Sequence, residues 1–283
     1  MLEIILLILI AGIWILGAVI SDLKKREIPN WINFSLIIFA LGIRFFYSLF
    51  FESAFFSFFI QGLIGLGIFF ILGNIFYYAR IFAGGDAKLL IALGSVLPFY
   101  NGFYMNMRVF LIWLMIFFFV GMVYGIVYSV FLAFKYFNPL KKQFKKIFKR
   151  EKNVFALLFL SGIVLVLAGF FESVFALFGL FFIIISFMYV CARAIDESCM
   201  VKKVKVSDLS EGDWLYKGIK IGRKKINSSW EGLTKKDIAL IKKNRDYVMI
   251  KQGIPYAPVF LISFIVLVAL FFLNHEIFYF FGF

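Results

Sequence analysis

Two aspartates stand out in this chain because each lies at the edge of a long apolar stretch. Asp22 ends the first apolar segment, just before Lys24, and Asp86 directly follows Gly84 and Gly85. A carboxylate beside a membrane span is expensive to desolvate, so it marks a candidate functional site. Two such carboxylates, brought together from distant positions, can share a proton and activate water. The pair therefore predicts acid–base hydrolysis.

Each aspartate also has a structural explanation, which the residues alone leave open. Asp22 can simply end a helix and pair with Lys25 or Arg26, as carboxylates next to membranes commonly do. Asp86 can cap a helix that begins at Ala87, with the preceding glycines permitting the turn. Lys88 either lowers the pKa of an aspartate or extends toward lipid phosphates.

The composition places the chain in a membrane. It has 283 residues, is 63% hydrophobic and has a mean hydropathy of +0.97, which no single soluble domain shows. The fold class is therefore an α-helical polytopic membrane protein with about eight, or six to eight, transmembrane helices. The eight apolar segments are 2–20, 30–50, 54–79, 87–104, 108–134, 154–171, 174–192 and 255–274.

The positive charges predict the topology. Four loops, at 21–29, 80–88, 135–153 and 193–253, hold 28 of the 30 Lys and Arg residues. The positive-inside rule puts these loops in the cytoplasm and both termini outside the plasma membrane. Asp22 and Asp86 then lie on the same, cytoplasmic, side.

The charge pattern also divides the chain into parts. We expect a transmembrane catalytic core at 1–134, a transmembrane hairpin at 154–198, and a last helix with an outer tail at 254–283. The loop 135–153 interleaves basic residues with Phe at helical spacing, which favours an amphipathic helix on anionic membrane lipids. Nucleic-acid binding, which the net charge of +14 invites, would need a soluble basic face instead.

Residues 199–253 predict a small cytoplasmic α+β domain before the last helix. Strands are expected at 201–206, 215–221 and 247–251, and a helix runs from an N-cap at Thr234 to about Asn244. A domain of this size buries little apolar surface on its own.

The sequence gives little support for a metal site or a cofactor site. Cys191 and Cys199 form no C-x-x-C pair and have no nearby histidine, and the only histidine, His275, reads as an interfacial residue. We expect no cofactor and no metal.

Three segments resemble a known family. Residues 22–30 and 84–90 look like the two signature segments of type IV prepilin leader peptidases, aspartic membrane proteases that include the archaeal preflagellin peptidases. Residues 253–260 are similar to the Ile-Pro-Phe-x-Pro-like start of a late span in that family. The resemblance implies that Asp22 and Asp86 are the catalytic pair and that Gly84, Gly85 and Lys88 form the motif loop. In the family's Gly-x-Gly-Asp pattern the first glycine falls on Ala83, where this chain departs.

The resemblance also implies an activity. The enzyme would remove short basic leaders from pilin-like or archaellin-like precursors at the cytoplasmic membrane face. Glu27, Asp196 and Glu197 are candidate contacts for the leader, with solvated surface charge as the alternative for each. Bacterial members with a cysteine-rich domain also N-methylate the product, and without that cysteine tetrad we expect cleavage alone.

Two other function classes compete with this one. A non-catalytic membrane subunit could keep the fold and bind pilin-like proteins without cleaving them. A small-solute transporter would need charge in the middle of its spans, and apart from Arg44, toward the outer end of its segment, the spans carry almost none.

Overall fold

The computed structural model describes residues 2–51, 56–221, 224–229 and 232–273. The predicted outer tail, with His275, lies mostly outside these residues. Two compact units are present, each described by itself below. The first combines residues 1–125 with the C-terminal segment from residue 254, and the second comprises residues 126–253.

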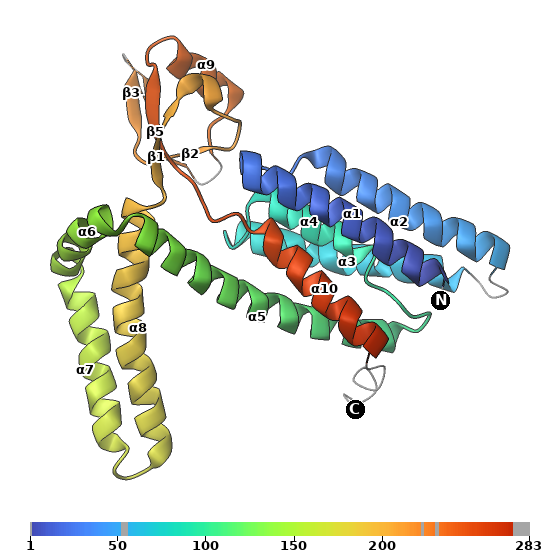
Figure 1. Ribbon diagram of the computed structural model, residues 1–283, viewed down its shortest axis with the longest axis horizontal. Coiled ribbons are helices and arrows are strands. Elements are labelled where there is room, and N and C mark those ends of the chain that lie inside the picture. The colour runs from blue at the N-terminus through green and yellow to red at the C-terminus, as the bar shows by residue number, and fades with distance from the viewer. Residues whose placement is uncertain (1, 52–55, 222–223, 230–231, 274–283) are drawn as a thin grey trace. The chain divides into compact units, whose positions relative to one another are not determined.

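The first unit is a bundle of apolar helices, in which α1, α2, α3, α4 and α10 lie side by side (Figure 1). The α1 helix ends where Arg26 takes a left-handed φ of 59°, and its amide donates to the Asp22 carbonyl at 2.9 Å. The helices that contribute are α1 (Leu2–Lys25), α2 (Asn30–Phe51), α3 (Ser57–Tyr78), α4 (Gly84–Gly94), α5 (Phe103–Lys135, which continues into the second unit) and α10 (Ala257–Leu273).

The structure confirms a polytopic helical membrane protein. In the described part of the chain, five helices are long and apolar enough to cross a membrane, namely α1, α2, α3, α5 and α8, or six if the bent pair α6–α7 counts as one. The predicted segment 87–104 is not a continuous helix, because α4 ends at Gly94 and Pro98 lies in the loop that follows. The α10 helix is apolar but has only 17 residues.

Close backbone contact joins α3 to α4. A Cβ atom on Gly65 would collide with the Gly94 carbonyl oxygen, and one on Gly94 would lie 2.5 Å from the Gly65 carbonyl oxygen. Small residues allow such close approach in membranes, where dispersion forces drive helix association. The position of α4 against α3 therefore depends on this glycine pair.

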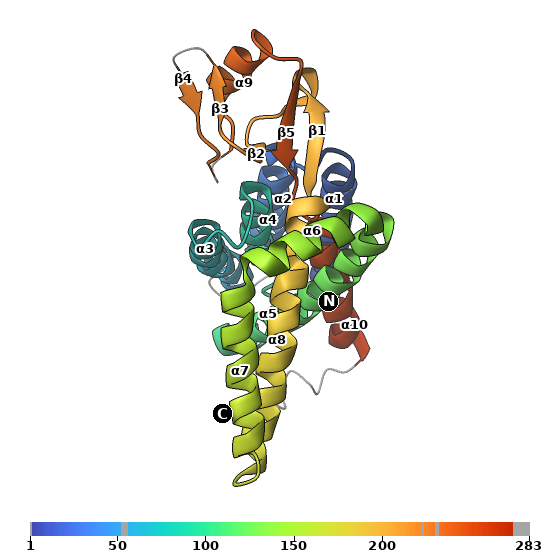
Figure 2. The same ribbon diagram turned by 90° about the vertical axis from the view of Figure 1, so that its left-hand side faces the viewer.

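In the second unit, α7 (Lys152–Ala168) and α8 (Ser173–Ser198) form a hairpin, and α6 (Phe137–Arg150) packs across its end (Figure 2). The predicted amphipathic segment is thus a helix. Its apolar face packs on α8, where Ile147 contacts Val190 and Ala194, while its basic side chains are exposed.

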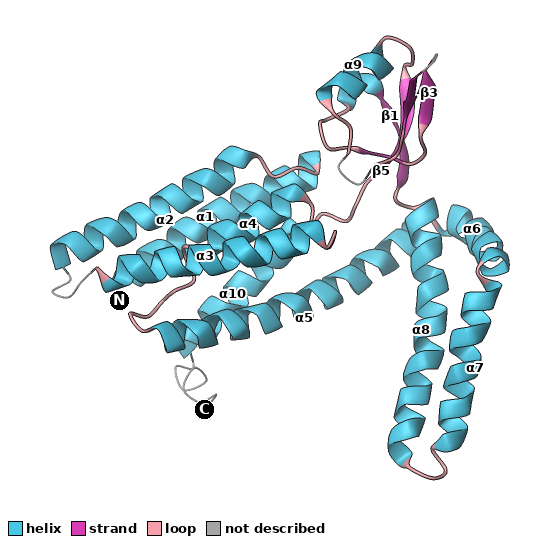
Figure 3. Cartoon of the chain, turned by 180° about the vertical axis from the view of Figure 1, so that it is seen from behind, coloured by secondary structure: helices cyan, strands magenta, loops and turns pink. Residues whose placement is uncertain are grey.

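Along the described part of the chain, strands are found only in the stretch of sequence that follows α8 and precedes α10 (Figure 3). The predicted strands at 201–206 and 247–251 are present as a directly paired antiparallel couple, and the stretch 215–221 is divided between two sheets. One sheet has the order β1 (Val201–Lys205), β5 (Tyr247–Lys251), β2 (Trp214–Leu215), and the other pairs β3 (Ile219–Ile221) with β4 (Lys224–Ile226).

One helix completes the small domain. The α9 helix (Lys235–Lys242) begins as predicted at Thr234, in a capping box with Asp237. Ile241, Val248 and Ile250 contribute to the small apolar core of this domain.

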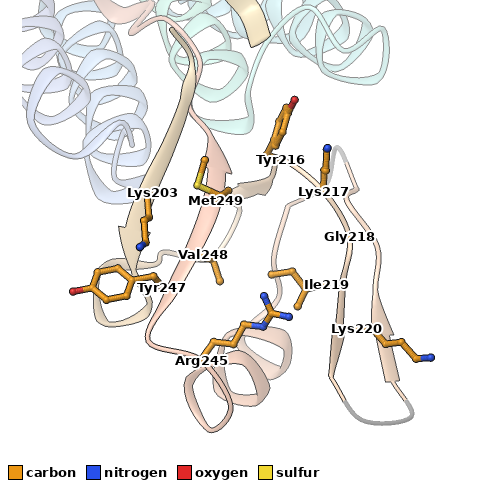
Figure 4. A pocket seen from close by; sticks show the side chains of 10 residues that line it. All are labelled: Lys203, Tyr216, Lys217, Gly218, Ile219, Lys220, Arg245, Tyr247, Val248 and Met249. Carbon is orange, nitrogen blue, oxygen red and sulfur yellow. The ribbon is translucent and has the colours of Figure 1, made fainter. Parts of the chain in front are cut away.

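A groove of about 450 Å³ opens on this small domain (Figure 4). None of its lining residues is acidic, and four are cationic: Lys203, Lys217, Lys220 and Arg245. Two of these cations lie over tyrosine rings, Lys203 over Tyr247 and Lys217 over Tyr216. Two tyrosine rings and four cations thus line this basic groove.

Candidate active site

Asp22 is fixed by a contact with the last helix. It lies one turn before the end of α1 and is only 7% exposed. Its Oδ2 atom accepts a hydrogen bond from the backbone N–H of Ala257, at 2.9 Å, and Ala257 is the first residue of α10. The first N–H groups of a helix have no partner within it and favour negative charge. The carboxylate of Asp22 is therefore held at the start of α10.

Asp86 lies in the first turn of α4 and is half-buried. The helix begins earlier than expected, at Gly84, so Ala83 is the N-cap residue and Asp86 is not. The Asp86 carboxylate instead accepts a hydrogen bond from the backbone N–H of Ala83. This contact is one half of a capping box, whose other half is missing because alanine has no side-chain oxygen.

The negative charge of Asp22 acts on Asp86. Burial, and then the negative charge of Asp22, raise the pKa of Asp86 to about 7, while the hydrogen bond from Ala83 opposes this rise. The fold has thus brought Asp22 and Asp86 into electrostatic range from two different helices. This is the arrangement in which one carboxyl stays protonated near neutral pH beside an ionised partner.

The motif loop uses small residues for close packing. Gly84 and Gly85 both lie within α4, and neither has a positive φ. A Cβ on Gly85 would lie 3.2 Å from Cβ of Ile28, whereas one on Gly84 would meet its nearest atom, on Tyr77, at 3.7 Å. Gly85 therefore permits the approach of α4 to the connector between α1 and α2. Ala83, with φ −69°, needs no glycine.

Lys88 and Glu27 flank this site. The Nζ atom of Lys88 donates to Oδ1 of Asn30 at 2.8 Å, which ties α4 to the start of α2. Glu27 lies just after α1, and its carbonyl oxygen accepts from the hydroxyl of Ser21 at 2.8 Å. Both residues thus belong to the same unit as the aspartate pair.

Asp196 and Glu197 lie at the end of α8, in the other unit. Asp196 pairs with Lys251 at 2.7 Å, and Glu197 pairs with Arg150 at 2.6 Å. These contacts tie α8 to β5 and to α6. The proposed contact of these two acidic residues with a leader peptide stays a prediction.

Tyr256 is a site residue that the sequence did not single out. Burial, and then the charge of Asp86, raise the pKa of its phenol. Its ring lies 5.6 Å from that of Phe82 and 5.8 Å from that of Phe117, measured between centroids, and its hydroxyl packs against Gly121. The available signal was its position in the segment 253–260, where the similar family motif has Phe.

Metal binding finds no support where the structure describes the chain: no three His, Cys, Asp or Glu side chains there are grouped to hold an ion. Both cysteines are free, Cys191 exposed and Cys199 buried.

Fold and site together define a polytopic helical membrane protein with two aspartates paired at the ends of separate helices. Residues 8–130, which contain both aspartates, match the sequence model of the type IV leader peptidase family. The chain is thus similar to that family over a segment that makes up less than half of its 283 residues.

One curated relative is a preflagellin peptidase from Methanocaldococcus jannaschii, with 37% identity over 93 residues. The aligned stretch covers 33% of this chain and 38% of the relative, so the chain matches about two fifths of that protein's length. No solved structure matches the chain.

Proposed function

We propose that this protein is an aspartic membrane endopeptidase that removes short basic leader peptides from pilin-like or archaellin-like precursors. The observation that carries the proposal is the electrostatic effect of Asp22 on Asp86, two residues that lie on α1 and α4 inside the segment that matches the family model. The preflagellin peptidase among the relatives supports the same class of substrate.

The two aspartates take different parts in hydrolysis. Asp22, whose Oδ2 accepts the Ala257 N–H, is the ionised base and removes a proton from a water molecule as the water attacks the scissile carbonyl carbon. Asp86 is the acid and donates its proton to the carbonyl oxygen. Collapse of the tetrahedral intermediate then breaks the C–N bond: the amine leaves with the proton that Asp22 took up, and Asp86 takes back a proton from one hydroxyl of the intermediate as the new carboxyl group forms.

The topology supports cleavage at the cytoplasmic face of the plasma membrane. By the positive-inside rule, the basic loops predict that the end of α1 and the start of α4 lie on that side, with both termini outside. A substrate would lie with its apolar helix in the bilayer and its leader just outside it. Glu27 is the candidate contact for the leader nearest to the pair in sequence, and Asp196 and Glu197 are the others. The reaction proposed is cleavage without N-methylation.

Anionic lipids are the proposed membrane partner of the exposed lysines on α6, and nucleic acid is not a proposed partner. The alternative function is that of a non-catalytic membrane subunit that binds pilin-like proteins.

The test is cleavage of pilin-like precursors by the purified protein in liposomes. Asp22→Asn and Asp86→Asn should each abolish cleavage while still binding the precursor, and the exposed Asp208→Asn should match the parent. The pair mechanism is wrong if either active-site variant cleaves as well as the parent. The subunit function is supported instead if the parent binds precursors but cleaves none.

A further inference from the structure

Arg44 is a fully buried charge to which the proposed mechanism assigns no part. It lies on α2 with 0% exposure, and its guanidinium donates four hydrogen bonds, each to a backbone carbonyl. Nη1 bonds the Phe58 carbonyl at 2.9 Å, at the start of α3. The other three bonds reach carbonyls just after α4, namely Ser95 at 2.8 Å from Nε, and Val96 at 3.0 Å and Pro98 at 2.6 Å from Nη2.

These carbonyls need an outside donor because α4 is short. The helix ends at Gly94, and Val96 and Leu97 beyond it are fully buried. In an apolar layer an unsatisfied carbonyl is strongly destabilising, and the C-terminal end of a helix carries partial negative charge. Arginine offers five N–H donors in a rigid plane, which a lysine cannot reproduce. Arg44 thus caps a helix that ends inside the bundle.

The neighbouring helix is shaped around this side chain. A Cβ atom on Gly62 would lie 2.5 Å from Cδ of Arg44 and 3.0 Å from its Nε. The Phe58 ring faces the guanidinium carbon at 4.3 Å from the ring centroid. Arg44 therefore has little freedom to move, and it joins α2, the start of α3 and the end of α4.

The other end of α4 carries Asp86. The helix has 11 residues and is about 16 Å long, so a shift at its C-terminal end moves its first turn as well. Asp22 lies on a different helix, α1, and would not follow this movement. A displacement of about 1 Å between reacting groups can lower a rate on the order of 100-fold.

We propose that Arg44 is a positioning residue for the Asp86 carboxyl, acting by fixing the end of α4. The expected effect of Arg44 on the cleavage rate rests on the proposed peptidase function. The effect of Arg44 on the geometry of Asp86 does not depend on that function.

The test compares Arg44→Gln with Arg44→Lys and with a matched control, Ser48→Ala. Ser48 is buried one turn further along α2, and its Oγ accepts the Phe59 N–H at 3.2 Å, so its removal weakens the α2–α3 contact without touching α4. Three quantities are measured on the purified protein: the folded fraction, kcat and KM for a precursor, and the pH midpoint for labelling of Asp86 by dicyclohexylcarbodiimide, which modifies protonated carboxyls.

We expect Arg44→Gln to lower kcat by roughly 100-fold while KM changes by less than about threefold. The labelling midpoint of Asp86 should fall by at least about half a pH unit, because the carboxyl moves away from Asp22. Arg44→Lys should lie between this variant and the parent, and Ser48→Ala should keep both the kcat and the midpoint of the parent.

A purely structural part for Arg44 predicts a different result, in which kcat falls only with the folded fraction and the midpoint is unchanged. That result overturns the proposal. If Arg44→Gln does not fold, Gly62→Ala replaces it, because the added methyl group displaces Arg44 without removing its charge, and an unchanged midpoint in this folded variant also overturns the proposal. If the parent cleaves no precursor, the proposed function fails, whereas the labelling midpoints still decide whether Arg44 positions Asp86.

Discussion

Asp22 and Asp86 have different surroundings, although both are carboxylates at helix ends. Asp22 accepts the Ala257 N–H and lies within electrostatic range of the positive charge of Arg26, whereas Asp86 accepts the Ala83 N–H and lies within range of the negative charge of Asp22. Hydrogen bonds to an ionised carboxylate favour the charged form, and a neighbouring negative charge disfavours it. This asymmetry is the reason for assigning the acid to Asp86.

The pH dependence of cleavage follows from this assignment. Asp86, with its pKa raised to about 7, must be protonated to donate to the scissile carbonyl oxygen. We expect kcat to fall about tenfold per pH unit as the pH rises above about 7. Single-turnover cleavage between about pH 5 and 9 measures this limb. A rate that stays constant up to pH 9 would show that Asp86 is not the acid.

Removal of Asp86 should also stabilise the protein. A carboxyl whose pKa is raised on folding binds more protons in the folded state, so stability falls as the pH rises from about 4 to about 7 and then stays level. Asp86→Asn lacks this loss, and we expect roughly 2–4 kcal/mol of added stability above pH 7. Thermal unfolding in detergent at pH 4 and pH 8 measures it. Asp208→Asn is the control. If Asp86→Asn adds the same stability at both pH values, the raised pKa of Asp86 is not the cause of the gain.

Individual residues were only partly predictable. The aspartate pair and the motif glycines were evident from their flanks, because charge and glycine are rare in apolar sequence. The environment of Arg44 was not, because three of its four hydrogen-bond partners, Ser95, Val96 and Pro98, lie more than 50 positions away. Tyr256 was missed for a similar reason, since Phe82 and Asp86 approach it only in the folded chain.

At the scale of elements, α4 is where sequence and structure differ most. The apolar run 87–104 predicts a span, yet the helix ends at Gly94. Apolar composition shows that a segment is buried, but it does not show which groups form hydrogen bonds with its backbone. Here the guanidinium of Arg44 provides the missing donors, so non-helical backbone is stable inside the bundle.

The approach of α4 to the α1–α2 connector gives a prediction on Gly85. Gly85→Val should lower kcat by at least roughly tenfold, because the added carbons meet Ile28 and push Asp86 away from Asp22. Gly84→Ala is the matched control, with only an ordinary contact to Tyr77 at 3.7 Å, and it should stay near the parent. Precursor cleavage under saturating substrate measures both. Equal losses in the two variants would mean that general helix damage, and not the contact with Ile28, is the cause.

Ala83→Gly tests the departure from the family pattern. The φ of Ala83 is −69°, which any residue adopts, so restoring glycine relieves no strain. We expect no gain in kcat and a loss of at most about 1 kcal/mol in stability from added backbone freedom. Cleavage and thermal unfolding measure the two effects, and a higher kcat would show that the loop needs glycine here.

At the scale of the whole molecule, the candidate site belongs to one unit that the chain builds in two passes. Residues 1–125 provide both aspartates, and the chain returns to the unit at residue 254 to place Ala257 on Asp22. The family match ends at residue 130, so the second unit lies almost entirely beyond it. Spans and charge bias were readable from the sequence. The return of α10 to Asp22 was not, because a contact across 235 positions leaves no local pattern.

The lysines of α6 allow a test of lipid binding. Its apolar face packs on α8, which turns the basic side chains outward. Each Lys near an anionic surface contributes about 1 kcal/mol, and salt screens this attraction. Lys142→Gln/Lys145→Gln/Lys149→Gln should therefore remove most of the rise in Tm that anionic lipid gives over zwitterionic lipid in mixed micelles at low salt.

The matched control removes the same charge from the basic groove of the small domain. Lys203→Gln/Lys217→Gln/Lys220→Gln changes three exposed lysines in that groove and leaves α6 intact. If α6 is the lipid-binding surface, this variant keeps the rise in Tm, and high salt abolishes the rise in the parent and the control alike. Equal losses in the two triple variants would instead mean that overall charge governs the effect, because the net charge falls by the same amount in both. If the α6 variant keeps the rise in Tm and the groove variant loses it, lipid binding belongs to the groove.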